Sequence, residues 1–360
     1  MNIHIITQTF PPKIGGMQSL MYYISKGLIS KTEEVFVYPD HYYKSKEPFK
    51  IYYFPAIKFF RPFVKRFLVK NNYKKNDVVI CDTWKSVFAV PKNVKNIICF
   101  AIGQEFLVNK KNKKIELIQK AFDRCKYIVS ITKFTENLLL SICKVDREKL
   151  HVIFPTFSVK TQNKKRIKSN NSPLNFLSIC RIEDRKGLLE TANSLISLYN
   201  QLPDFNWRIV GEGPSKKILE ETIKKSIISK NVIFEGFVSE TKKSKLLSNS
   251  DLFLMPGYIA KKSVEGFGIV YTEAASYGIP SIGGVDGGAP EAIINNKTGW
   301  CVDPKNKDKL KETLLEASTN KFLREKYGKN AKKSFDEIFS GTIAFDRLNN
   351  LLKELKKQPT

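Results

Sequence analysis

The sequence lacks the features that mark membrane-spanning, secreted and disulfide-bonded proteins. No stretch reaches the roughly 18 uncharged apolar residues that cross a bilayer, so we expect no transmembrane helix. Residues 1–6 lack the basic region and the cleavage site of a signal peptide and predict a strand instead. The six cysteines form no C-x-x-C pair, and most lie in apolar runs, as buried thiols do in a reducing compartment. We therefore expect a cytoplasmic protein.

Motifs of three other chemistries are absent as well. No G-x-G-x-x-G follows the first predicted strand, which argues against a nicotinamide dehydrogenase. No D-x-D occurs in the chain, so we expect neither a metal nor a cofactor besides the substrate. The sequence contains no recognisable RNA- or DNA-binding module, and we expect no nucleic-acid partner.

Acidic residues are scarce in the first half of the chain. The 360 residues have a net charge of +26, and residues 1–170 contribute 32 Lys and Arg against 12 Asp and Glu, a net of +20. A basic first half favours an anionic partner, such as acidic phospholipid, nucleic acid or a phosphorylated substrate. A general abundance of Lys, Asn and Ile in the source organism explains part of the total, but it does not explain the asymmetry.

Residues 58–70 read K-F-F-R-P-F-V-K-R-F-L-V-K and mix bulky apolar side chains with cations. This pattern is typical of segments that lie in a membrane interface. We therefore expect the first domain to attach peripherally to an anionic membrane surface, the inner face of the plasma membrane. The alternative is a helix that covers the core and extends its lysines into solvent.

The length of the chain fits two domains, and 42% hydrophobic residues suffice for a core in each. Apolar runs alternate with amphipathic stretches, which predicts an α/β protein with two Rossmann-like, doubly wound domains that face a central cleft. The expected bounds are 1–160 for the first domain, 161–173 for a linker and 174–335 for the second domain. The expected strands are residues 2–8, 34–38, 77–81, 96–101, 127–131 and 151–154, then 174–180, 207–210, 232–234, 252–255, 281–282 and 300–302.

The first motif, F-P-P-K-I-G-G at residues 10–16, follows the first predicted strand and opens a helix. Gly15 and Gly16 would let a ligand approach the backbone, and the helix N-terminus is a seat for phosphate. The alternative is that these glycines only serve the geometry of the turn.

The second motif, C-R-I-E-D-R-K-G at residues 180–187, ends the first strand of the second domain. It places Arg181 and Lys186 at the carboxyl end of a strand, where two cations suit a diphosphate whose charge grows as a bond to it breaks. The alternative is a surface ion-pair cluster of Arg181 with Glu183, Asp184 and Arg185.

The third motif, E-G-F-G-I-V-Y-T-E-A at residues 265–274, is the most specific. Its glycine loop can bring Glu265 to a sugar, while the amides of Gly268, Ile269 and Val270 face a phosphate. Glu273 can accept two hydrogen bonds from a ribose diol. Two carboxylates also fit a hydrolase acid–base pair, but the tight loop and the helix dipole favour a nucleotide diphosphate.

These motifs, in this order, resemble those of the retaining GT-B glycosyltransferases of family four, often called group 1. The resemblance also includes G-E-G-P at residues 211–214, F-E-G-F at residues 234–237 and G-G-A-P-E at residues 287–291. It implies transfer of a sugar from a UDP- or GDP-sugar to a glycan or lipid-linked acceptor of a cell-envelope pathway, such as lipopolysaccharide synthesis. It also implies that the first domain lies on the acceptor side and that the second domain binds the nucleotide sugar. Residues 336–360 would form a helix that crosses back to the first domain.

The resemblance assigns roles to individual residues. Arg181 and Lys186 would neutralise the leaving diphosphate, Glu265 would hold the donor sugar, and Glu273 would hold the ribose. Retention would follow from a front-face reaction in which a diphosphate oxygen helps to deprotonate the acceptor. The remaining donor-binding positions would be Gly15, Gly16, Val238, Phe267, Gly268, Ile269 and Val270.

Two positions depart from the family pattern, and at one of them Gly257 stands where a serine frequently follows Pro256. The chain reads F-A-I-G-Q-E at residues 100–105, so Ile102, before Gly103, stands where a histidine usually contacts the sugar. An apolar wall in this sugar pocket would suit a 6-deoxy sugar. Two alternatives remain at this point: a nucleotide-sugar epimerase of the same fold, and a non-catalytic relative that binds anionic surfaces.

Overall fold

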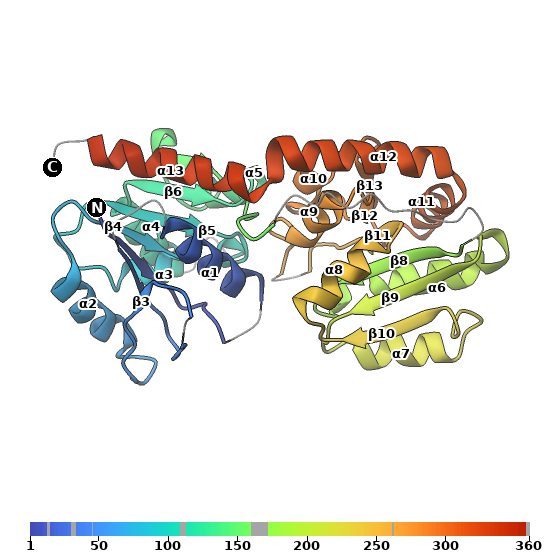
Figure 1. The fold of residues 1–360 in the computed structure, drawn as a ribbon, viewed down its shortest axis with the longest axis horizontal. Helices are drawn as coiled ribbons and strands as arrows, with labels where there is room; N and C mark the ends of the chain where they lie inside the picture. Colours follow the sequence, from blue (N-terminus) through green and yellow to red (C-terminus); the bar gives the residue numbers. More distant parts are fainter. Residues whose placement is uncertain are drawn as a thin grey trace. The chain divides into compact units, whose positions relative to one another are not determined.

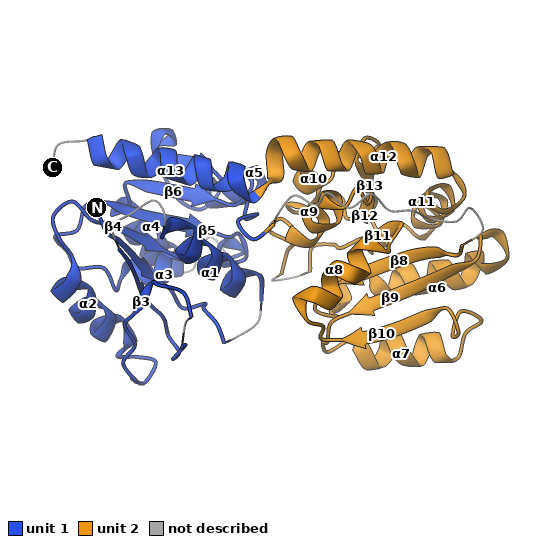
Figure 2. Cartoon of the chain, viewed as in Figure 1, with its two compact units in different colours: residues 1–158, 341–360 blue, residues 159–340 orange. Residues whose placement is uncertain are grey.

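A computed structural model describes residues 1–12, 15–29, 34–44, 46–108, 113–159, 172–260 and 263–357 of the chain. It divides into two compact units, drawn in different colours in Figure 2: unit 1 is Met1–Ser158 with Gly341–Thr360, and unit 2 is Val159–Ser340. The predicted linker, 161–173, lies outside the described residues except for its last two positions. Each unit is described by itself below, and the predicted cleft stays a prediction.

Unit 1 contains a seven-stranded parallel sheet in the order β3-β2-β1-β4-β5-β6-β7 (Figure 1). All four residues of β1, β2, β4 and β6 are buried, because both faces of a parallel sheet are covered by helices. The strands are β1 (Ile3–Ile6), β2 (Val35–Tyr38), β3 (Lys50–Ile51), β4 (Val78–Cys81), β5 (Ile97–Ala101), β6 (Tyr127–Ser130) and β7 (Leu150–Val152).

The helices of unit 1 come from both ends of the chain. The last helix belongs to this unit: Tyr127 donates a hydrogen bond to Glu354 over 2.9 Å, and the rings of Phe157 and Phe345 lie 4.9 Å apart. The helices are α1 (Gly16–Leu28), α2 (Arg61–Asn72), α3 (Trp84–Val87), α4 (Lys114–Asp123), α5 (Lys133–Leu140) and α13 (Gly341–Lys357), with 3₁₀ turns at η1 (Gln104–Phe106) and η2 (Arg147–Lys149).

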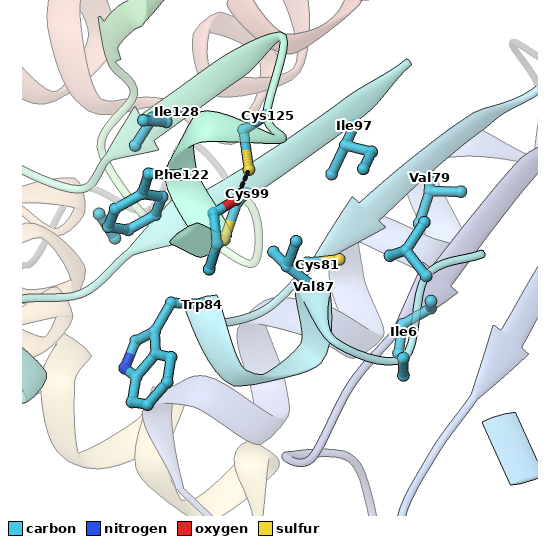
Figure 3. Close-up of a cluster of buried hydrophobic side chains, with 14 of the residues drawn as sticks. Ile6, Val79, Cys81, Trp84, Val87, Ile97, Cys99, Phe122, Cys125 and Ile128 are labelled. Carbon is cyan, nitrogen blue, oxygen red and sulfur yellow. Dashed lines mark hydrogen bonds between the residues drawn. The ribbon is translucent and has the colours of Figure 1, made fainter. Parts of the chain in front are cut away.

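One hydrophobic core of unit 1 lies between the sheet and helices that include α3 and α4 (Figure 3). Cys81, Cys99 and Cys125 are free thiols within it, surrounded by residues such as Ile97 and Phe122. Burial raises the pKa of the Cys81 and Cys99 thiols well above the usual value, so these cysteines act as small apolar side chains.

Unit 2 contains a six-stranded parallel sheet in the order β10-β9-β8-β11-β12-β13. Its strands are β8 (Leu174–Ile179), β9 (Phe205–Val210), β10 (Val232–Gly236), β11 (Leu252–Met255), β12 (Ser281–Gly283) and β13 (Gly299–Cys301). Its helices are α6 (Leu188–Leu198), α7 (Lys216–Lys224), α8 (Glu240–Ser248), α9 (Ile269–Ser276), α10 (Ala289–Ala292), α11 (Lys307–Thr319) and α12 (Lys321–Ser334). They are joined by the 3₁₀ turns η3 (Asp184–Lys186) and η4 (Tyr199–Gln201) and the π-helical turn η5 (Phe335–Phe339).

In both sheets the direction in which successive strands are added reverses once. In unit 1 the chain adds β2 and β3 on one side of β1 and then returns to place β4 on the other side. In unit 2 it adds β9 and β10 beside β8 and returns to β11. This is the doubly wound α/β arrangement predicted from the sequence, and the crevice at each reversal, at the carboxyl ends of the strands, is where such sheets bind ligands.

No described helix is both long enough and apolar enough to cross a membrane.

Candidate functional site

The centre of the site in unit 2 is the carboxylate of Glu265. Lys186, which follows β8, and Glu265, which follows β11, come from the two strands at the reversal of the sheet. The ammonium group of Lys186 contacts Oε2 of Glu265, and Nη1 of Arg185 lies 3.2 Å from the same oxygen. The structure thus brings together two of the three predicted catalytic residues, Lys186 and Glu265.

Burial and charge act in opposite directions on Glu265. The side chain is 21% exposed, and burial by itself raises its pKa. The adjacent Lys186 and Arg185 lower the pKa by more, so that it lies below the usual value for glutamate. Glu265 is therefore an ionised acceptor at neutral pH, and it can hold the hydroxyl groups of a ligand.

Arg181 lies apart from this centre. Its side chain is 71% exposed, and among the described residues it pairs with Glu183, at 2.9 Å. Glu183 also accepts from Nε of Arg185 at 3.2 Å, so part of the surface ion-pair cluster considered above is present. Asp184 accepts a hydrogen bond from Ser215 instead of joining it.

Sequence reasoning missed Arg185 as a site residue. Arg185 and Lys186 both belong to the 3₁₀ turn η3, where successive residues turn by about a third of a circle. The turn is followed by Gly187, whose φ of +69° is left-handed and whose Cβ would lie 2.0 Å from the carbonyl oxygen of Pro256. A side chain at this position is excluded, and the close approach holds η3 against the end of β11.

The glycine loop that carries Glu265 leads into α9. Gly268, with a φ of +85°, is the N-cap of this helix, and the first amides of a helix have no partner within it. The loop is supported from behind: the amide of Gly288 donates to the carbonyl of Glu265 over 2.8 Å. A Cβ at Gly288 would lie 1.9 Å from the carbonyl oxygen of Gly266, so the two loops require glycine to approach.

The other predicted donor-binding residues differ in their exposure. Phe267 is 2% exposed, and its ring lies 5.8 Å from that of Phe339, so its side chain packs in the core. Ile269 and Val270 are half-buried in the first turn of α9. Val238 is half-buried in the short connection between β10 and α8. Any contact of these residues with a nucleotide stays a prediction.

Glu273 lies in the second turn of α9 and is paired with a lysine that the sequence did not reveal. The Lys243 ammonium lies 2.8 Å from Oε1 of Glu273 and 3.0 Å from Oε2 of Glu240. Burial raises the pKa of Glu273, and Lys243 counteracts part of this increase. For Lys243, burial lowers the pKa, but the two carboxylates raise it by more than burial lowers it. The pKa therefore lies above the usual value for lysine, and the side chain is charged.

The predicted residues of unit 1 lie at the carboxyl edge of its own sheet. Gly15 is the N-cap of α1 and Gly16 its first residue, while the two preceding residues, 13 and 14, lie outside the described part of the chain. The loop after β1 is held by the buried carboxylate of Asp82, which follows β4. Its Oδ2 accepts from Oγ1 of Thr7 and of Thr9, each over 2.9 Å, and from the amide of Gln8 over 2.7 Å.

Ile102 and Gly103 follow β5 at the same edge. The amide of Ile102 donates to Oε1 of Glu105 over 2.8 Å, and burial raises the pKa of Glu105. Gly103 has a φ of +111°, and its Cβ would lie 3.2 Å from Oγ1 of Thr135. Ile102 itself is half-buried, and its contact with a sugar stays a prediction.

Comparison with known proteins identifies relatives of unit 2. Residues 159–334 match the family model described as "Glycosyl transferases group 1". The chain is 32% identical to the GDP-mannose-dependent monoacylated alpha-(1-6)-phosphatidylinositol monomannoside mannosyltransferase of Corynebacterium glutamicum over 175 residues, which are 48% of this chain and 45% of that protein. The chain spans about half the length of such curated relatives.

Solved structures resemble the whole chain. A glycosyltransferase from Rickettsia africae ESF-5 has a TM-score of 0.80 and 18% identity, and the match covers 99% of each chain. Anabaena Alr3699/HepE in complex with UDP-glucose has a TM-score of 0.77 and 15% identity, with 98% of this chain and 100% of that chain covered. At these identities the likeness shows the fold, which is GT-B, as the sequence predicted.

Proposed function

Because residues 159–334 match the family model of the group 1 glycosyl transferases, we propose that this chain transfers a sugar from a UDP- or GDP-sugar to a glycan or lipid-linked acceptor. The proposed reaction retains the anomeric configuration and needs no metal ion. The observation that carries the proposal is the position of Glu265, which Lys186 and Arg185 hold beside the N-terminus of α9 at the reversal of the sheet.

The charges of the site suit a nucleotide diphosphate. The ion-paired cluster contains three cations and two carboxylates, because Glu183 pairs with both Arg181 and Arg185, so the cluster keeps one net positive charge for an anion. The N-terminus of α9 adds free amides and the positive end of the helix dipole. Such groups stabilise the negative charge that develops on a departing diphosphate, which is the role that a divalent ion has in other enzymes.

Glu273 is the proposed ligand of the ribose. Its carboxylate is 16% exposed and bonds Lys243 through one oxygen, Oε1. A carboxylate has about four acceptor positions, so it can accept hydrogen bonds from two neighbouring hydroxyl groups as well. The Anabaena relative is described in complex with UDP-glucose and the Corynebacterium relative as GDP-mannose-dependent; these names support a nucleotide-sugar donor here.

The proposed chemistry takes place on one face of the sugar. The bond between the anomeric carbon and the diphosphate oxygen breaks, and a new bond forms between that carbon and the acceptor oxygen. The acceptor proton passes to the departing diphosphate oxygen. Glu265 would hold the hydroxyl groups of the sugar during this exchange, because its lowered pKa keeps it ionised.

The proposal also includes attachment of unit 1 to a membrane that holds the acceptor. On α2 and the segment before it, Phe59, Phe60, Phe63 and Phe67 are between 51% and 74% exposed. The cations of this segment divide: Lys65 is buried against Asp40, whereas Lys58 and Lys70 are exposed. Exposed phenylalanines flanked by lysines suit the interface of an anionic bilayer, and the Corynebacterium relative is named for a lipid acceptor.

Co-sedimentation with phosphatidylglycerol vesicles tests the membrane part. We expect binding at low salt that falls as salt rises. The double variant Phe59→Ser/Phe63→Ser should lose binding, whereas Phe322→Ser, at an exposed position of α12, should keep it. No binding of the native protein at low salt, or equal binding of all three proteins, would contradict membrane attachment.

Incubation with UDP- and GDP-sugars tests the transfer itself. We expect release of free UDP or GDP from at least one donor, and loss of this release in Glu265→Gln, which removes the charge but keeps the shape. Lys309→Met, in an exposed ion pair of α11, is the matched control and should behave like the native protein. Conversion of the donor sugar into an epimer without nucleotide release would show that the protein is an epimerase instead.

A further inference from the structure

Unit 1 contains a pocket that includes none of the residues discussed above. Its volume is about 260 Å³, and its lining consists of Tyr42, Tyr43, Phe49, Ile51 and Tyr53. Tyr42 and Tyr43 follow β2, and Tyr53 follows β3, so these side chains belong to the carboxyl ends of two neighbouring strands. This is the edge at which doubly wound sheets bind ligands.

The inner wall of the pocket is fixed by the loop that follows β1. Phe10 is 1% exposed, and its ring lies 5.7 Å from that of Tyr43 and 6.0 Å from that of Phe49. The ring of Tyr22 from α1 lies 6.2 Å from that of Tyr43, edge to face, and 6.2 Å from that of Phe10, so the three rings form one cluster. Phe10 opens the F-P-P-K-I-G-G motif, so the pocket is built onto the same loop that carries Gly15 and Gly16.

The outer wall is more open. The rings of Tyr42 and Tyr53 lie 6.1 Å apart, and Tyr42 is 63% exposed. Among the described residues, the hydroxyl groups of Tyr42, Tyr43 and Tyr53 make no hydrogen bond to protein. The pocket therefore offers aromatic faces together with three hydroxyl groups that can donate to or accept from a ligand.

This combination matches the surface of a sugar. One face of a pyranose ring presents C–H groups, which the negative face of an aromatic ring attracts, and its edge presents hydroxyl groups. The kind of aromatic residue favours a sugar over a lipid, because the exposed aromatic residues of the neighbouring α2 are phenylalanines, whereas three residues of the pocket are tyrosines. Phenylalanine suits lipid chains, and tyrosine suits a ligand with polar edges.

We propose that this pocket binds a pyranose ring of the acceptor glycan. The inference rests on the proposed transferase function, and it adds the pocket and the chemistry by which unit 1 would recognise the acceptor. The rings of Tyr42 and Tyr53 would stack on the sugar, and the three hydroxyl groups would bond its edge. The inner residues Phe10 and Phe49 would hold the wall that the sugar contacts.

Saturation-transfer NMR on the full chain tests the pocket, with the methyl α-glycosides of glucose, galactose, mannose and N-acetylglucosamine as probes. We expect at least one probe to receive saturation from the native protein. Tyr42→Ala and Tyr53→Ala should weaken its binding by about tenfold, the size of one lost ring contact. Tyr42→Phe keeps the ring and should lose less affinity for the probe. Phe322→Ala, the matched control at an exposed aromatic residue of unit 2, should bind the probe like the native protein.

Binding of UDP and GDP is measured on the same samples, so that the two proposals can fail separately. No saturation transfer to any probe, or equal transfer in the native protein and both alanine variants, would overturn the pocket assignment even if nucleotide binds. Saturation transfer that depends on Tyr42 and Tyr53 without nucleotide binding would support a sugar site in unit 1 and contradict the transferase function.

Discussion

Replacement of Lys186 by methionine separates the structural and the chemical roles of the site. The side chains of Lys186 and Glu265 are 9% and 21% exposed, so the substitution leaves a largely buried carboxylate with one cation fewer. Loss of one partner from a buried pair costs about 3–5 kcal/mol. Arg185 still contacts the same oxygen at 3.2 Å. We therefore expect the free energy of unfolding to fall by about 2 kcal/mol, at the lower end of the cost of an unsatisfied charged group.

The effect should depend on pH in a defined direction. Lys186 and Arg185 hold the pKa of Glu265 below the unfolded value of about 4.3. A depressed pKa stabilises the fold at pH values above the unfolded pKa, and this contribution is lost as the pH falls through the folded pKa. The stability difference between the native protein and Lys186→Met should therefore be complete at pH 7 and shrink below about pH 4.

Urea unfolding and donor kinetics measure the two roles. We expect an earlier transition of unit 2 and a fall in kcat of roughly a hundred-fold or more, because the cation serves the departing diphosphate. Lys186→Arg should restore much of the stability, and Lys309→Met should change neither quantity. A native urea midpoint together with a native kcat in Lys186→Met would refute the assigned role of Lys186 and Glu265.

Three further predictions concern the donor. Glu273→Ala should weaken donor binding more than it lowers kcat, because the ribose contact is made equally in the ground and transition states; an unchanged donor Kd would contradict this. Transfer should persist in EDTA, and activity that EDTA abolishes and magnesium restores would show a metal requirement. A 6-deoxy sugar should compete better than its hydroxylated parent in kcat/KM, by at most roughly a hundred-fold, and Ile102→His should reduce the preference; equal use of both donors by both proteins would leave Ile102 as a packing residue.

The sequence predicted most strands because their apolar runs stand out between polar stretches. The elements it missed are short or polar. Strand β3 has two residues and helix α3 has four, too few to show a period. Helix α8 buries only Leu246 and Leu247 among mostly polar residues, so its hydrophobic pattern is weak. Because the helix was not predicted, Lys243 was not recognised as a site residue.

The segment at residues 58–70 shows what spacing can and cannot reveal. Arg61 and Lys65 are four residues apart and therefore share a helix face, which lies against Asp40 in the structure. Phe63 and Phe67 share another face, which is exposed. The spacing predicts the two faces, but only the fold shows which of them is buried, because Asp40 is distant in sequence.

The two arginines of the second motif lead to a similar conclusion. Both Arg181 and Arg185 are close to Lys186 in sequence, and the family resemblance favours Arg181. The 3₁₀ turn η3 directs Arg185 toward Glu265, whereas Arg181 precedes the turn and extends into solvent. The turn ends at Gly187, which approaches Pro256 closely, and the motif by itself does not reveal this contact because Pro256 is distant in sequence.

A crystal structure with UDP or GDP bound tests the central assignment most directly. We predict that the diphosphate lies at the carboxyl edge of unit 2, between β8 and β11, with oxygens within about 2.7–3.2 Å of the Lys186 ammonium and the first amides of α9. Glu273 should accept hydrogen bonds from the ribose. A nucleotide bound elsewhere on the chain, or a diphosphate that contacts neither Lys186 nor the N-terminus of α9, would contradict the account.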